Sequence, residues 1–423
     1  MARRRGRRRL VRAAARHQGG LRSARSAEPG RDVRPGRGAG LVSDPIDRAP
    51  AAARTVWTAP RTSRDGVNVV AIIGIVIGSL VGLAVIGFLA LLLGIPVLLV
   101  ASVLAFLPLV VVLLVIRWID RWEPEPRAAL WFAFLWGAAV SVAVALLVGF
   151  GVELAGTIAT GTPGVDPFVS AVIQAPLVEE VAKGVGVLIL FASARSHFDG
   201  PVDGLVYAAT VAAGFAFTEN ILYFGSALTD EGAAGLGATF VVRGIFSPFA
   251  HVMFTACTGL ALGLAARRGR SVSALLWFVV GLVGAIALHA LWNGAFFFVP
   301  DVVVYYLFVQ VPLFVFAIIV TLALRRSEMQ VTRTRLQEYA DAGWFTADEV
   351  VMLATPAGRR QARAWARTQP PARRASMRAF IRDATHLAFT RERIATGRAD
   401  IGHPVDEHLL LRQINEDRAV LLG

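Results

Sequence analysis

The stretch VVAIIGIVIGSLVGLAVIGFLALLLGIPVLLVASVLAFLPLVVVLLVI, residues 69–116, contains no charged side chain and is divided only at Gly94-Ile95-Pro96. A helix that crosses the hydrocarbon core of a bilayer needs about 20 consecutive apolar residues. The stretch is long enough for two such helices, 68–93 and 95–117, or for one hairpin that does not fully cross. Either interpretation predicts that this part of the chain lies in a membrane.

Apolar runs of spanning length continue after this pair. Hydrophobic residues make up 55% of the chain and its mean hydropathy is +0.58, whereas an ordinary soluble domain is about 45–50% apolar. Six further runs follow, at residues 129–154, 167–192, 204–224, 238–266, 272–298 and 302–324. The sequence therefore predicts an all-α fold, a polytopic bundle of about eight transmembrane helices within residues 67–326.

Both ends of the chain differ from the bundle. Residues 1–66 are rich in Arg, Ala, Gly and Pro without apolar periodicity, which predicts a disordered basic cytoplasmic arm near anionic lipid headgroups. This arm contains most of the excess of Arg that gives the chain its net charge of +13, so we expect no specific binding of nucleic acid. Residues 327–423 are polar and Pro-interrupted, and amphipathic patterns at roughly 334–354, 372–396 and 405–421 predict a small α-helical cytoplasmic tail, either a separate module or an appendage at the membrane interface.

The arginines between the apolar runs predict the orientation of the chain. Cytoplasmic loops carry an excess of Lys and Arg. Arg occurs in residues 117–127, 195–203 and 267–270 and in the tail, whereas the alternate loops contain Asp or Glu and no Arg. We therefore expect a multi-pass protein of the plasma membrane with both termini in the cytoplasm. Arg243 lies just inside the sixth run at its outer end, where its side chain is expected to reach the headgroups.

Ionisable side chains inside a membrane are costly and mark function by default, and here they fall in four consecutive runs. The fourth run carries Glu179, Glu180 and Lys183, the fifth Glu219 and Asn220, the sixth His251, and the seventh His289 and Asn293. At a rise of about 1.5 Å per residue, the expected depths of these positions differ by one or two helical turns. They are therefore predicted to meet in one polar chamber in the outer half of the membrane.

Two histidines and a carboxylate in such a chamber are typical of a metal site. This set is common in catalytic zinc centres and leaves one position open for water. His251 and His289 are the candidate ligands, with Glu219 as the candidate third ligand for Zn²⁺. The sequence predicts a metal-assisted hydrolase on this basis.

The remaining polar residues have candidate roles in the hydrolysis of a peptide bond. Glu179 or Glu180 is the candidate general base, which takes a proton from water and later delivers it to the leaving amine. Lys183 can keep one of these glutamates ionised, and Asn293 can donate hydrogen bonds to a developing oxyanion. Asn220, next to Glu219 in the fifth run, is a further candidate.

These strings together resemble the motifs of the PrsW family of bacterial intramembrane proteases, which is related to the CAAX-protease-like membrane superfamily. The resemblance covers about residues 115–300. Its motifs are DRWEPEP from Asp120 to Pro126, EExxK with Glu179, Glu180 and Lys183, DG at Asp203 and Gly204, FxxxEN with Phe215, Glu219 and Asn220, HxxxT with His251 and Thr255, and HxxxN with His289 and Asn293. The basic arm and the tail lie outside the resemblance.

The resemblance implies proteolysis within or beside the membrane. Membrane-anchored proteins are the implied substrates, with anti-sigma factors as one class. The related superfamily implies a second mechanism, in which glutamate and histidine activate water without a tightly bound metal.

Two other functions use the same residue types. An ion- or proton-coupled membrane transporter also places Glu, Lys and His inside the membrane, but transporters usually contain internal repeats. Neither EExxK nor HxxxN recurs in the sequence, which counts against transport. A structural scaffold would not need so many costly polar groups, although Glu179 or Glu180 with Lys183 could serve as a packing ion pair alone.

Overall fold

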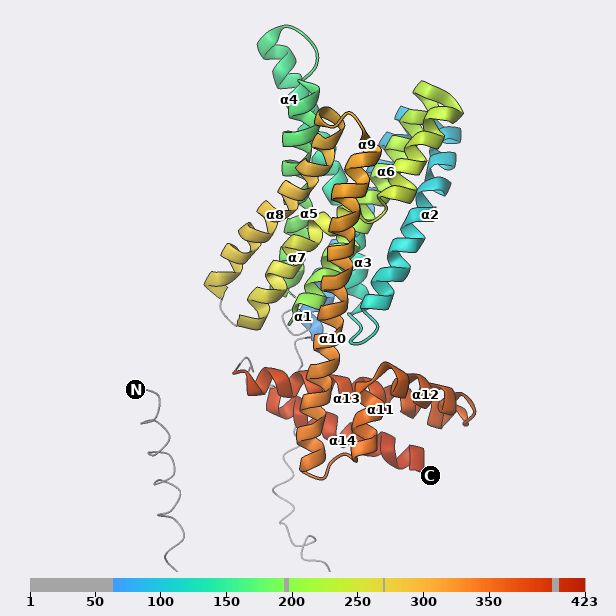
Figure 1. Ribbon diagram of the computed structural model, residues 1–423, viewed down its shortest axis with the longest axis vertical. Coiled ribbons are helices and arrows are strands. Elements are labelled where there is room, and N and C mark those ends of the chain that lie inside the picture. Colours follow the sequence, from blue (N-terminus) through green and yellow to red (C-terminus); the bar gives the residue numbers. More distant parts are fainter. Residues whose placement is uncertain (1–63, 194–197, 269–270, 398–402, 423) are drawn as a thin grey trace, which may run out of the picture. The chain divides into compact units, whose positions relative to one another are not determined.

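The computed structural model describes residues 64–193, 198–268, 271–397 and 403–422, and the regular structure in these ranges is helical (Figure 1). All the described residues belong to one compact unit, 59–423. The basic arm predicted for residues 1–66 lies outside the described residues, apart from its last three. The predicted all-α fold of a polytopic membrane protein is confirmed.

The bundle consists of long helices joined by short loops and π-helical turns. Its helices are α1 Arg64–Leu93, α2 Ile95–Ile119, α3 Arg127–Leu135, α4 Val142–Thr160, α5 Ala175–Ser193, α6 Pro201–Phe240, α7 Ala250–Arg268, α8 Ser271–Phe298, α9 Val302–Tyr305 and α10 Val311–Asp341. The π-helical turns are η3 Trp136–Ser141, η4 Val169–Gln174, η5 Val241–Phe246 and η6 Tyr306–Gln310. Each apolar run of the sequence coincides with helical structure.

Among the described residues, six helical stretches are long and apolar enough to cross a membrane. One of them, Pro201–Arg268, is 68 residues long and contains two of the eight predicted runs, which the chain joins by bending at Gly232. The α5 segment is not among the six, because it contains three charged side chains, Glu179, Glu180 and Lys183. The difference between eight and six thus comes from one joined pair and one polar helix.

Helix α6 is the centre of the bundle, and it packs closely against α7. A Cβ atom added at Gly204 would lie 2.0 Å from the carbonyl oxygen of Gly259, and one added at Gly263 would lie 2.4 Å from that of Gly200. Small residues let helix backbones approach in this way inside membranes. The pairing 204 with 259 and 200 with 263 makes the two helices antiparallel and fixes their register.

The loop between α2 and α3 is folded back on the bundle. The backbone N–H of Glu125 donates to Asp120 Oδ1 at 2.9 Å, and the hydroxyl of Tyr207 on α6 donates to Glu125 Oε2. Burial, reinforced by the charge of Asp203, raises the pKa of Glu125 well above its usual range, and burial raises the pKa of Asp120 to about 7. The loop is therefore tied to the start of α6 by largely desolvated carboxyl groups.

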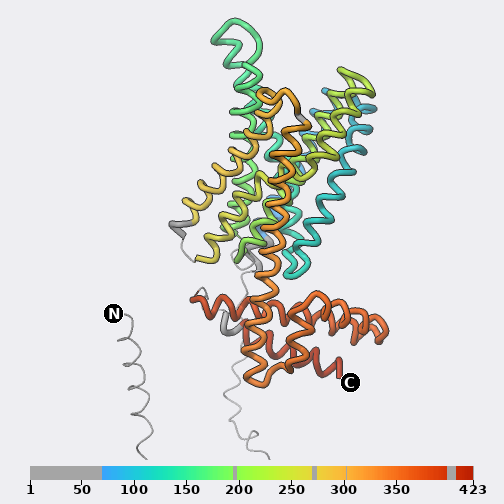
Figure 2. The backbone as a smooth tube through the Cα atoms, in the orientation of Figure 1, coloured from blue at the N-terminus to red at the C-terminus, as the bar shows by residue number. Residues whose placement is uncertain are grey.

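The tail is a group of helices around the end of α10, which runs without a break from the bundle (Figure 2). Its further helices are α11 Ala347–Ala354, α12 Pro356–Arg367, α13 Pro371–Ala395 and α14 His403–Leu422. Its apolar core includes Leu336, Leu353, Phe380, Leu387 and Ile414.

One tail helix predicted from the sequence is wrong in its extent. The predicted helix 334–354 is divided, because α10 ends at Asp341 and Gly343 adopts φ 83°, a left-handed conformation that favours glycine. Thr346 and Glu349 then form a capping box that starts α11. Helix α12, which the sequence analysis did not predict, follows at once. The predicted helices 372–396 and 405–421 correspond to α13 and α14.

Arg359 of α12 joins the tail to the α2–α3 loop. Its guanidinium lies 3.5 Å from the ring of Trp122 and donates to Trp122 O, Leu353 O and Thr385 Oγ1. Trp122 Nε1 in turn donates to Thr332 Oγ1 of α10 at 3.0 Å. Arg359 and Trp122 are both buried, so their contact is shielded from water. We call this contact between the tail and the α2–α3 loop the Arg359–Trp122 clamp.

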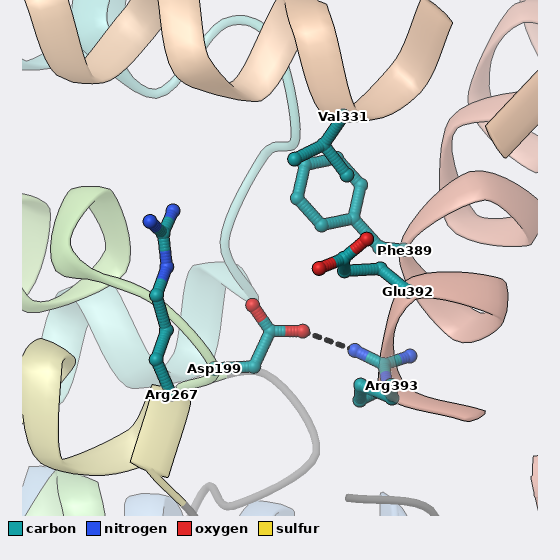
Figure 3. A pocket seen from close by; sticks show the side chains of 6 residues that line it. All are labelled: Asp199, Arg267, Val331, Phe389, Glu392 and Arg393. Atoms are coloured by element: carbon teal, nitrogen blue, oxygen red, sulfur yellow. Dashed lines mark hydrogen bonds and ion pairs between the residues drawn. The ribbon is translucent and has the colours of Figure 1, made fainter. Parts of the chain in front are cut away.

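A second contact lies beside the start of α6, where Arg393 of α13 forms an ion pair with Asp199 (Figure 3). A cavity of about 80 Å³ adjoins the pair and is lined by Asp199, Arg267, Val331, Phe389, Glu392 and Arg393. Both contacts attach the tail to loops at the same end of the bundle.

We predict that Arg359→Ala destabilises the tail. The substitution removes three hydrogen bonds and a cation–π contact from a buried site, which should cost about 2–4 kcal/mol. Thermal unfolding of the detergent-purified protein, followed by tryptophan fluorescence, should show a midpoint several degrees lower. Arg360→Ala, at the exposed neighbouring position, is the control and should leave the midpoint unchanged. Equal midpoints for both variants would show that the clamp contributes no stability.

Candidate active site

Four helices bring the predicted polar residues together. Helix α5 carries Glu179, Glu180 and Lys183, the first arm of α6 carries Glu219, α7 carries His251, and α8 carries His289. The π-helical turn η4 ends two residues before Pro176, which has no N–H to donate to the preceding turn. This irregular turn sets the rotation of α5 and thus the face on which its glutamates lie.

Lys183 lies at the centre of the cluster and is fully buried. Its Nζ lies 2.7 Å from Glu180 Oε1, 3.3 Å from Glu179 Oε2 and 3.3 Å from His251 Nδ1. The ring of Phe215 on α6 covers the ammonium group at 3.8 Å. Both glutamates predicted near Lys183 are therefore its partners.

Glu180 uses both carboxylate oxygens to join helices. Oε1 accepts from Lys183 and lies 3.1 Å from His289 Nδ1, and Oε2 accepts from Thr255 Oγ1 of α7 at 2.8 Å. Glu180 is fully buried and His289 is 98% buried. Because a carboxylate only accepts, Nδ1 of His289 is the protonated nitrogen and Nε2 has the free lone pair.

The two neighbours of His251 impose one tautomer on it. Its Nδ1 faces the Lys183 ammonium, which only donates, and its Nε2 lies 2.9 Å from Glu219 Oε2, which only accepts. Nδ1 is therefore the acceptor nitrogen and Nε2 carries the proton. Each histidine thus donates one N–H to a carboxylate, an arrangement typical of metal ligands.

Among the described residues, one group of three could hold a metal ion: Glu179, His251 and His289, whose ligand atoms all lie within 4.8 Å of one another. Ligand atoms bound tetrahedrally to zinc at 2.0–2.1 Å lie about 3.4 Å apart, so shifts of about 1 Å suffice. With neutral imidazoles, the three glutamates outnumber the cations Lys183 and Arg243 by one charge. The donor types, their spacing and the excess negative charge all fit a divalent cation.

Glu179, and not Glu219, is thus the carboxylate that the structure brings together with both histidines. Glu219 lies beside Nε2 of His251, where Arg243 of η5 pairs with it. The guanidinium of Arg243 points to Glu219 and Asn220 of α6, so the side chain that was expected to reach the headgroups is bound to the site. Sequence reasoning missed this contact, although an arginine within an apolar run is itself a signal of function.

The two asparagines are held by other partners. Asn293 lies one turn after His289 on α8, but its Nδ2 donates to the carbonyl oxygen of Ala171 in η4 at 2.7 Å. Asn220 Oδ1 accepts from Arg243 Nε at 2.8 Å. Asn293 therefore ties α8 to the turn before α5, and Asn220 holds Arg243.

The fold and this cluster define a polytopic membrane protein with a buried glutamate–histidine–lysine site and a candidate metal centre. Residues 125–320 match the family described as PrsW family intramembrane metalloprotease. A protein named protease PrsW from Clostridioides difficile is 30% identical over 190 residues, which cover 45% of this chain and 76% of that relative. The chain belongs to the PrsW family.

Other relatives match over shorter lengths. Proteins named protease PrsW from Geobacillus kaustophilus and Bacillus subtilis are 30% and 29% identical over 146 and 131 residues. The chain spans 58% and 54% of the length of these two relatives. No solved structure matches the chain. The matched region contains every residue of the cluster, whereas the tail after α10 lies outside it.

We predict that Lys183→Met destabilises the bundle, because it leaves two buried carboxylates without their shared cation. Breaking a buried ion pair from one side costs about 3–5 kcal/mol. Thermal unfolding in detergent should show a clearly lower midpoint, whereas Val181→Met at an exposed position of α5 should not. Adding Glu180→Gln to Lys183→Met should recover part of the loss, since one uncompensated charge is removed. An unchanged midpoint in Lys183→Met would contradict this account of the cluster.

Proposed function

We propose that this chain is an intramembrane endopeptidase that binds Zn²⁺ and hydrolyses a peptide bond in a membrane-anchored protein. The observation that carries the proposal is the group of Glu179, His251 and His289, which lies within the part of the chain that matches an intramembrane metalloprotease family. Membrane-anchored anti-sigma factors are the substrate class that the resemblance implies.

In this proposal Glu179, His251 and His289 hold the ion. A bound zinc ion supplies Lewis-acid polarisation of the scissile carbonyl and a water of lowered pKa. Glu180 holds the Nδ1–H of His289 and so directs its Nε2 toward Glu179, 3.9 Å away. Lys183 balances the charge of the two adjacent glutamates.

Glu219 is the proposed proton acceptor. Its contacts with Arg243 and His251 both use Oε2, so Oε1 is available to take a proton from the attacking water and return it to the leaving amine. This assignment differs from the sequence prediction of Glu179 or Glu180 as the base. It is supported by the full use of both Glu180 oxygens in contacts between helices.

We predict that the full-length protein purified in detergent contains about one zinc ion, and that the His251→Ala/His289→Ala variant contains none. Elemental analysis by mass spectrometry measures this directly. His408→Ala, at an exposed position of α14, is the matched control and should retain the metal. Cleavage of a single-pass reporter in proteoliposomes should disappear in the double variant and after chelation.

Three other outcomes are informative. Normal cleavage after exhaustive chelation would reject the zinc and favour the metal-free glutamate–histidine mechanism. Proton or ion flux that Glu180→Gln abolishes, without any peptide cleavage, would favour the transporter. Unchanged activity in every cluster variant would favour the scaffold.

We further propose that both termini and the tail lie in the cytoplasm of a bacterial cell, with the chain in the plasma membrane. The loops that contact the tail, through Trp122 and Asp199, lie in segments 117–127 and 195–203, which contain Arg, whereas the alternate loops contain none. Green fluorescent protein fused after Gly423 should therefore fluoresce. Alkaline phosphatase inserted after Gly164, in the α4–η4 loop, should be active, and the reverse pattern would refute this orientation.

A further inference from the structure

Arg243 reaches the site through an unusual path of the chain. Helix α6 bends at Gly232, where φ is 70°, and its second arm leads into the π-helical turn η5. Ser247 closes this turn, since its backbone N–H and its hydroxyl both donate to Val242 O, at 3.0 and 2.7 Å. The bend and the turn together return Arg243 to the first arm of α6, beside Glu219.

Three side chains on the first arm of α6 hold the guanidinium. Its Nε donates to Asn220 Oδ1 at 2.8 Å, its terminal nitrogen pairs with Glu219 Oε2, and its plane lies 4.0 Å from the ring centre of Tyr223. Only 20% of the Arg243 side chain and 13% of that of Glu219 are exposed. Most of both side chains is therefore enclosed by protein.

The oxygen that Arg243 binds is the one that His251 also binds. Glu219 Oε2 accepts from Nε2 of His251 at 2.9 Å, and Nδ1 of the same ring faces Lys183, which also binds Glu179. An unbroken chain of contacts therefore runs from Arg243 through Glu219 to a candidate metal ligand. Glu180 contacts His289 in the same way, and Glu180 itself accepts from Lys183 and Thr255.

We propose that Arg243 is a positioning residue that holds the Glu219 carboxylate against Nε2 of His251, and so fixes the ring orientation and tautomer that leave the lone pair on Nδ1, which a metal ion would take in place of its contact with Lys183. This inference rests on the proposed metal-binding function of the cluster. Without the guanidinium, Glu219 would lie near two other glutamates with no cation of its own, and the carboxylate would turn toward the exposed side. Loss of such an outer partner typically weakens metal binding 10–100-fold.

The geometry requires arginine and not merely a positive charge. The planar guanidinium donates to Asn220 and Glu219 at once from two nitrogens, while its face covers Tyr223. A lysine ammonium is a point charge and cannot reproduce this fork. In Arg243→Lys the ammonium group should therefore still attract the Glu219 carboxylate but should no longer hold it in one orientation.

The test is the zinc affinity of the full-length protein in detergent, measured by competition with a chromophoric chelator. The dissociation constant should rise 10–100-fold in Arg243→Gln and by a smaller factor in Arg243→Lys. Arg268→Gln is the matched control, because Arg268 also stacks on a tryptophan, Trp277, but lies at the far end of α7 from His251. Its zinc affinity should equal that of the wild type.

The outcomes separate this inference from the proposed function. Stoichiometric zinc in the wild type with equal affinity in Arg243→Gln would overturn the role of Arg243 and leave the metal site intact. No zinc in the wild type would overturn the metal site itself. If Arg243→Gln does not fold, the zinc dissociation constant of Arg243→Lys is the test. The visible spectrum of Co²⁺ bound to this variant in place of zinc then shows whether a histidine ligand has been displaced.

Discussion

The ammonium group of Lys183 is fully enclosed by the helical bundle. Its need for hydrogen-bond acceptors constrains how four helices pack around it. Burying an unpaired charge in a membrane is costly, so the surrounding groups must be acceptors. Lys183 binds Glu180 on its own helix and His251 on α7, under the Phe215 ring of α6. Glu180 then reaches His289 on α8. If α5 rotated by one residue, every one of these contacts would be lost.

The close approach of α6 and α7 supplies the second constraint. The Gly204–Gly259 contact leaves no room for a side chain, so the two backbones have a single register. That register sets the height of His251 relative to the first arm of α6, and the bend at Gly232 then brings the second arm back to the same level. Arg243, in the turn η5 that follows the second arm, consequently meets Glu219 on the first arm, and Glu219 in turn contacts His251. The close packing of α6 against α7 thus determines which polar side chains lie next to one another in the site.

The spanning helices and the polar chamber that four of them form could both be predicted from the sequence. Spanning helices need a length and hydropathy that few other structures require, and buried charges must find partners. Which carboxylate faces both histidines could not be predicted, because Glu179 and Glu180 are adjacent and the π-helical turn η4 changes the rotation of α5. The position of Arg243 depended on a hairpin within α6, which a run of apolar residues does not reveal. Local signals would have divided the predicted helix 334–354, since Gly343 and the Thr346–Glu349 capping box are visible in the sequence.

The tail lies outside the family match, yet it is attached to the helix that carries Glu219. Arg393 pairs with Asp199, and the backbone N–H groups of Asp199 and Gly200 donate to Asp203 Oδ2, which caps the start of α6. From this capped turn the first arm of α6 runs as one helix to Glu219. A tail that holds Asp199 therefore holds the base of the helix on which the site depends. The glutamate–histidine site lies within the region that matches the family, whereas Arg393, which pairs with Asp199 at the base of α6, lies in the C-terminal region outside that match.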